Sequence, residues 1–143
     1  MDGIRGYWNG YHLVSRHSKQ YHYPSWFIAE LPKGIPLDGE IWIGRQMFEN
    51  TVALLNSSHP SHPLWKKLKY MVFDLPIENL AYESRIERLK QMNLPSHVII
   101  VESKQCQGNH QLLEALTTIL TQGGELILMG EGLDCIASFG ISV

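Results

Sequence analysis

The residues of this sequence that could do chemistry begin at its start. Asp2, Gly3 and Arg5 stand close together, and Arg16 follows an expected strand. An arginine offers a planar, permanently charged set of donors that suits an anionic ligand, and glycine lets the backbone approach a ligand closely. Read alone, Asp2-Gly3 also fits an ordinary turn, because Asp-Gly is common where a chain reverses. The first segment therefore indicates either an anion-binding site or a turn.

Two later segments carry acidic or aromatic residues on expected strands. In residues 37–44 a two-residue period places the aliphatic side chains on one face and the acidic ones, Glu40 among them, on the other. Residues 69–76 are rich in strand-forming residues and include Phe73. Taken alone, Glu40 would be a solvated carboxylate and Phe73 a core side chain. Whether Glu40 and Phe73 have a functional role depends on which other residues of the chain lie beside them.

A β-hairpin is expected around these first residues. Residues 4–8 and 11–15 are rich in strand formers, and Asn9-Gly10 lies between them. Asn-Gly favours a two-residue type I′ turn because both central positions need positive φ. The sequence therefore predicts that the Asp2–Arg5 segment leads into a hairpin.

Three helices and one more strand are expected from apolar periodicity. The first helix carries a core stripe of Phe48, Val52 and Leu55, and the second covers residues 78–91. A short apolar strand follows at 98–101. The third helix begins at Asn109 and ends at Gly123-Gly124, and its wide apolar face comprises Leu112, Leu113, Leu116, Ile119 and Leu120.

Composition places the chain among ordinary globular proteins. It has 143 residues, 44% of them apolar and 18% charged, with a formal net charge of −2. This charge argues against a free-standing basic nucleic-acid binder. There is no apolar run long enough for a transmembrane helix and no secretory leader, so an intracellular, membrane-free location is expected.

Three segments of the chain together resemble the ATP-dependent DNA ligases. Asp2-Gly3-Ile4-Arg5 is similar to the end of the family pattern K-x-D-G-x-R, and residues 37–42 (LDGEIW) to L-D-G-E-(L/I)-W. Residues 69–76 resemble the family's (M/L)-x-F-D-x-P strand. Residues 25–32 and the region from Cys106 to Glu125 add weaker similarity.

The resemblance implies an α+β fold. The expected domain is the nucleotidyltransferase (ATP-grasp-like) adenylation domain, with two twisted, mainly antiparallel sheets flanked by helices and a nucleotide groove between them. Residues 1–129 would form a partial adenylation domain and residues 130–143 a divergent tail, and the OB domain of the family would be absent.

The resemblance also assigns roles to individual residues. Arg5 and Glu40 would orient the ribose of the nucleotide, Phe73 would stack on adenine, and Arg16 would bind a phosphate. Asp2 would support the surroundings of the nucleophilic lysine. Either Glu125 or Glu131 would hold the metal. The distance from the preceding motifs favours Glu125, whereas the neighbouring residues of Glu131 match the family pattern better.

The implied activity is sealing of nicked duplex DNA by a monomer that uses ATP and Mg²⁺ and passes through enzyme-bound AMP. DNA repair, replication and recombination are the processes that use it. The family's lysine would fall just before Met1, so the chain as given is expected to form no protein–AMP adduct, and its ends suggest an incomplete reading frame. An RNA ligase or capping-type nucleotidyltransferase stays an alternative, as does a non-catalytic nucleotide- or DNA-binding remnant.

Overall fold

The computed structural model describes residues 3–57, 59–121, 126–129 and 134–139. The chain divides into two units, one of residues 2–100 and one of residues 101–143 with residue 1. The larger unit contains, in chain order, β1 (Ile4–Trp8), β2 (Leu13–Val14), α1 (Ser25–Ala29), β3 (Leu37–Trp42), α2 (Phe48–Asn56), the 3₁₀ helix η1 (Pro63–Lys67), β4 (Lys69–Asp74), α3 (Tyr82–Lys90) and β5 (Val98–Ile100). The smaller unit contains β6 (Glu102–Gln107), α4 (Asn109–Thr121), β7 (Leu126–Met129) and β8 (Asp134–Phe139).

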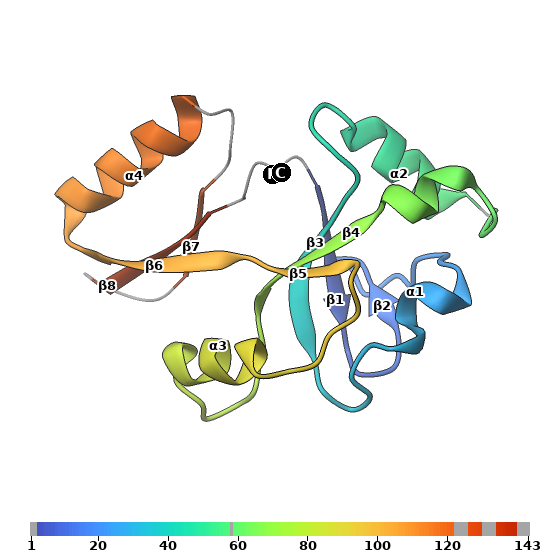
Figure 1. The fold of residues 1–143 in the computed structure, drawn as a ribbon, viewed down its shortest axis with the longest axis horizontal. Coiled ribbons are helices and arrows are strands. Elements are labelled where there is room, and N and C mark those ends of the chain that lie inside the picture. The colour runs from blue at the N-terminus through green and yellow to red at the C-terminus, as the bar shows by residue number, and fades with distance from the viewer. Residues whose placement is uncertain (1–2, 58, 122–125, 130–133, 140–143) are drawn as a thin grey trace. The chain divides into compact units, whose positions relative to one another are not determined.

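The larger unit is built on a five-stranded sheet in the order β2-β1-β3-β4-β5 (Figure 1). Its strands pair antiparallel except for β4 and β5, which are parallel. Burial alternates along β3 as its sequence predicts, with Leu37 and Ile41 fully buried and Asp38 and Glu40 half-buried. One face of the sheet therefore meets the core, where Phe27 of α1 and the side chains of α2, η1 and α3 join it.

Tyr70 fixes the centre of this sheet from the core side. It is fully buried, and its hydroxyl lies 2.9 Å from the carbonyl oxygens of both Gly6 and Leu37, to which it can donate. Burial raises the pKa of this phenol well above its usual value. A Cβ at Gly39 would meet the Met71 carbonyl oxygen and lie 2.9 Å from the Tyr70 ring. The glycine of the D-G-E segment is thus required by the packing of β4 against β3.

The predicted hairpin forms, but its turn differs from the prediction. The last pair of the ladder is Trp8 with Leu13, so residues 9–12 make a four-residue connection and β2 has only two residues. The Asn9 side-chain oxygen accepts hydrogen bonds from the backbone N–H groups of Tyr11 and His12, and within residues 9–12 only Gly10 has positive φ. The two-residue type I′ turn is therefore wrong, because Asn9 uses its side chain to close an Asx turn instead.

Two of the predicted helices are confirmed with altered bounds or faces. The second helix spans only 82–90, because Ala81 is extended and serves as the N-cap. In α2 the buried residues are Thr51, Leu54 and Leu55, whereas Phe48 is 43% exposed. Phe48 is the first residue of α2, so a core stripe that starts there is wrong.

The smaller unit is a three-stranded antiparallel sheet in the order β6-β8-β7, with α4 packed on β6 and β8 (Figure 1). Of the expected apolar face of α4, Ile119 is buried, whereas Leu113 and Leu120 are 61% and 60% exposed. The predicted apolar face of α4 is therefore too wide, because a helix that packs on a sheet buries only one stripe of its side chains. A mixed α+β fold is thus confirmed. Every helix within the described residues is too short or too polar to cross a bilayer.

Candidate nucleotide-binding face

The face of the five-stranded sheet that lies opposite the core carries the residues singled out in the sequence. Arg5 lies directly opposite Glu40 in the β1–β3 ladder, and Glu40 lies opposite Met71 in the β3–β4 ladder. Directly opposed residues share a face, so these three side chains stand on one side of the sheet. Phe73 follows Met71 by two positions and shares that side.

A β-bulge in β4 sets the direction of the Phe73 side chain. The register steps from Gly39 opposite Val72 to Asp38 opposite Asp74, which leaves Phe73 as the extra residue of a β-bulge. A bulge bends its strand and redirects the side chain at that point, and bulges are common beside functional sites. The guanidinium carbon of Arg5 lies 5.2 Å from the centre of the Phe73 ring, in the geometry of a cation–π contact. The ring itself is 1% exposed.

Asp38 orients Arg5 across the same face. The Arg5 Nε and Nη2 atoms donate to the two Asp38 carboxylate oxygens at 2.8 and 2.5 Å, a bidentate pair. The hydrogen bond to Asp38, helped by the charges of Asp38 and Glu40, raises the Arg5 pKa against the opposing effect of burial. The Arg5 side chain is still 54% exposed, so the cation is held in place and accessible.

Gly3 allows the Glu40 carboxylate to lie close to the start of the chain. A Cβ at Gly3 would stand 3.0 Å from Glu40 Oε2 and 2.9 Å from the Ile41 carbonyl oxygen. Real Cβ atoms almost never approach oxygen so closely, so any side chain at position 3 would push Glu40 away. The D-G-x-R and D-G-E segments therefore fit one another as a unit.

Sequence and fold comparisons agree on the type of domain. The chain is 30% identical over 132 residues to a DNA ligase of Haemophilus influenzae, a match that covers 90% of this chain and 48% of the relative. A solved structure from a structure-function analysis of Lig E DNA ligases, which concerns DNA binding with a minimal scaffold, superposes with a TM-score of 0.79. It is 27% identical, and the match covers 97% of this chain and 59% of that one. The chain carries a DNA ligase-type domain.

This ligase-type domain spans about half the length of the curated relative. No family model matches the sequence. The resemblance inferred from the sequence motifs is nevertheless confirmed by both the relative and the solved structure.

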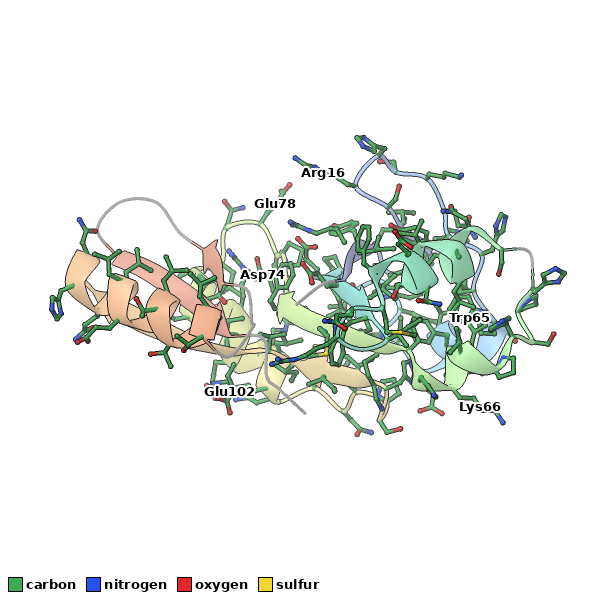
Figure 2. The ribbon with its side chains drawn as sticks, turned by 90° about the horizontal axis from the view of Figure 1, so that it is seen from above. Arg16, Trp65, Lys66, Asp74, Glu78 and Glu102 are labelled. Carbon is green, nitrogen blue, oxygen red and sulfur yellow. The ribbon has the colours of Figure 1, made fainter. Side chains whose placement is uncertain are left out.

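Arg16 stands apart from the other candidates. It is exposed on the loop that follows β2, as Figure 2 shows. The Ser15 hydroxyl oxygen accepts a hydrogen bond from the Lys19 backbone N–H at 3.1 Å and so shapes this turn. The loop leaves the ladder toward the Arg5 end of β1, where the Tyr21 hydroxyl donates to the Arg5 carbonyl oxygen. Its role in phosphate binding stays a prediction.

The predicted metal site and the support for the nucleophile cannot be placed. Asp2, Glu125 and Glu131 lie outside the described residues. Within the described residues, no three His, Cys, Asp or Glu side chains gather in a way that could hold a metal ion. The Mg²⁺ site of the ligase-type domain therefore stays a prediction.

Sequence reasoning missed two acidic residues of the same motifs. Asp38 is one letter of the D-G-E segment with no role predicted from the sequence, and in the structure it binds Arg5. Asp74 accepts from the Arg85 Nε and Nη2 atoms at 2.9 and 3.1 Å and from the backbone N–H of Leu75 at 2.7 Å. Strand alternation groups Asp38 with Glu40 on one face, but its pairing with Arg5 depends on the register between β1 and β3. Nothing local identifies Arg85 as the partner of Asp74.

Proposed function

We propose that this domain binds the adenosine part of ATP on the Arg5–Phe73 face and serves ATP-dependent sealing of nicked duplex DNA. The observation that carries the proposal is the meeting of Arg5, Glu40 and Phe73, from three separate segments, on one face of the sheet. The similarity to DNA ligases supports the same function.

In the proposed arrangement each side chain does what its chemistry allows. Glu40 accepts hydrogen bonds from ribose hydroxyl groups, since a carboxylate has only acceptors. Arg5 has more N–H donors than Asp38 uses, so others are available to the ribose. Phe73 covers one face of adenine without needing hydrogen bonds. Arg16 offers its charge to a phosphate from the neighbouring loop.

The reaction proposed for the whole protein has three steps. A lysine amine attacks the α-phosphate of ATP and pyrophosphate leaves, which gives a lysyl-AMP. The AMP then passes to the 5′-phosphate at a nick, and the 3′-hydroxyl of the other strand end displaces AMP to close the phosphodiester bond. The part assigned to the described residues is binding and orientation of the nucleotide.

Arg5 would also change its contacts when the base binds. Its guanidinium lies over the Phe73 ring, and this ring is 1% exposed. Stacking of adenine therefore requires that the guanidinium leave the ring and rotate toward the ribose. The Arg5 side chain is 54% exposed, so water can solvate the guanidinium during this movement.

The test is the affinity of the 143-residue chain for AMP, read from the amide resonance of Gly39 on β3 in a titration followed by NMR. Phe73→Leu should weaken the affinity about fivefold or more, because an aromatic platform contributes roughly 1–3 kcal/mol per stacked base. Phe48→Leu is the matched control, since Phe48 is exposed on α2 and outside the site. Equal AMP affinities for the wild type and Phe73→Leu would contradict the proposal.

A further inference from the structure

The larger unit contains a cavity whose lining includes none of Arg5, Glu40 and Phe73. It is a cavity of about 520 Å³, a size typical of sites that bind small molecules. Three separate segments form it: α1 and the residue after it, η1 with the start of β4, and the loop before β5. Its walls include Trp26, Glu30, Lys66, Lys69, Ser96 and His97.

The charged side chains of this cavity favour an anion. Lys66 and Lys69 contribute two ammonium groups and Glu30 one carboxylate. Burial, with a smaller contribution from the nearby Lys69 charge, lowers the pKa of His97, so its ring is neutral at neutral pH. The His97 Nε2 atom lies 2.7 Å from the Phe27 carbonyl oxygen, which can only accept, so Nε2 carries the proton and Nδ1 is an acceptor.

An aromatic side chain is held ready beside these charges. Trp26 is 44% exposed although it is large and apolar. Its ring makes edge-to-face contacts with Phe27 at 5.6 Å and with His97 at 5.5 Å between centroids. These contacts fix the indole while part of it stays open to a ligand. A rigid, exposed aromatic ring is the kind of surface on which a base can stack at low entropic cost.

We propose that this cavity is a second nucleotide site, in which Lys66 and Lys69 bind the phosphate and Trp26 stacks on the base. Glu30 repels the phosphate from its side of the cavity and accepts from amino or hydroxyl groups of the base or sugar. The site is separate from the Arg5–Phe73 face: Lys69 opens β4 and Phe73 lies near its end, about 13 Å away at the usual rise per residue. The bound nucleotide is either free or one unpaired unit of a DNA strand.

The first experiment follows the indole N–H resonance of Trp26 in the ¹⁵N-labelled chain during titration with dAMP. We expect a saturable shift with dAMP, and a much weaker response to deoxyadenosine alone or to inorganic phosphate alone, because each supplies half of the contacts. No shift of Trp26 at any dAMP concentration would overturn the proposal. A shift equally strong with deoxyadenosine would also overturn it, because the lysines would then contribute nothing.

Variants of neighbouring lysines sharpen this test. Lys66 and Lys67 are consecutive, exposed residues of η1, but only Lys66 lines the cavity, and Figure 2 shows Lys66 at the outer side of this short helix. Lys66→Ala should weaken dAMP binding roughly fivefold, as expected for one lost charge-assisted hydrogen bond, whereas Lys67→Ala should bind like the wild type. Equal losses in both variants would reveal general electrostatic attraction and would contradict a defined site.

Phe73→Leu separates this proposal from the proposed function. It should leave the Trp26 shift unchanged while it weakens AMP binding read at Gly39, so either site can fail without the other. To identify the source of the nucleotide, the same resonance is followed with blunt hairpin DNA and with the same hairpin carrying a short single-stranded overhang. A shift with dAMP and with the overhang supports a strand unit, and a shift with dAMP but with neither hairpin supports a free nucleotide. A shift as strong with the blunt hairpin as with the overhang would contradict a site for an unpaired nucleotide.

Discussion

Two arginine–aspartate pairs, each with its aspartate on the five-stranded sheet, differ in how far the arginine is buried. The comparison distinguishes a pair that stabilises the fold from one that is available to a ligand. Arg85 and Asp74 form a bidentate pair whose side chains are 22% and 9% exposed, and Arg85 Nη1 also donates to the Leu80 carbonyl oxygen. Arg5 and Asp38 form a bidentate pair too, but the Arg5 side chain is 54% exposed. Both pairs join a guanidinium to a carboxylate, but the Arg85 guanidinium is mostly buried whereas the Arg5 guanidinium is largely exposed to solvent.

The buried pair joins the end of β4 to α3, and Figure 2 shows Asp74 near the end of its strand. The Tyr82 ring lies 5.5 Å from the Arg85 guanidinium, and the Tyr82 hydroxyl donates to the Phe73 carbonyl oxygen at 3.3 Å. This arrangement uses the donors of Arg85 within the protein. The exposed pair instead leaves Arg5 able to exchange partners, which a ligand-binding residue requires.

The largest effect is expected from Asp74→Ala. It would leave the Arg85 charge without its carboxylate partner and the Leu75 N–H without an acceptor, at a position where Asp74 is 6% exposed. We expect a loss of about 3 kcal/mol in the free energy of unfolding, measured by urea denaturation. The matched change Asp38→Ala should cost about 0.5 kcal/mol, because Arg5, the cation of that pair, is 54% exposed and can be solvated by water instead. Similar losses in the two variants would break the comparison.

A smaller effect is expected from Arg85→Lys. Lysine cannot reproduce the planar fork that reaches both Asp74 oxygens and the Leu80 carbonyl oxygen together. We expect a loss of about 1–2 kcal/mol in the same assay, and a change within about 0.5 kcal/mol for Arg5→Lys. Arg5→Lys should still weaken AMP binding, since lysine cannot hold Asp38 and a ribose hydroxyl at once. A stability loss in Arg5→Lys as large as that in Arg85→Lys would show that the exposed pair is structural as well.

The smallest effect concerns pH and the half-buried His97. Its pKa is lowered by burial and by Lys69, against smaller opposing effects of the Phe27 carbonyl and Glu30. The unfolded chain therefore takes up a proton near pH 6.5 that the folded chain resists, and stability should fall as pH drops below about 6.5. His97→Gln keeps a donor for the Phe27 carbonyl oxygen and should show a shallower loss between about pH 7 and pH 5.5. Exposed His22→Gln should follow the wild type, and a response of His97→Gln as steep as that of the wild type would contradict the assignment.

The sequence predicted which residues share one face of the sheet better than it predicted which of their side chains bind one another. Alternation along β3 placed Glu40 away from the core, and the motifs grouped it with Arg5 and Phe73. The pairing of Asp38 with Arg5 could not be predicted, because it depends on register between strands far apart in the chain. The Phe73 bulge is a step in that same register, so it has no local signal either.

Apolar periodicity also could not predict which apolar side chains are buried, because burial depends on how the elements pack. Leu113 and Leu120 of α4 read like core residues, yet they are exposed because the sheet beneath covers only one stripe of the helix. Residues 134–139 carried no recognised motif, although β8 is the central strand of the smaller sheet. The Trp26 cavity was missed for a related reason, since three separate segments build it and no single one carries a motif.

The most direct test of the central claim is a set of intermolecular nuclear Overhauser effects between unlabelled AMP and the isotope-labelled chain. Adenine base protons should show contacts with the Phe73 ring protons, and ribose protons should show contacts with the side chains of Glu40 and Arg5. Contacts from the bound adenine to other parts of the chain only, with none to Phe73, would contradict the account.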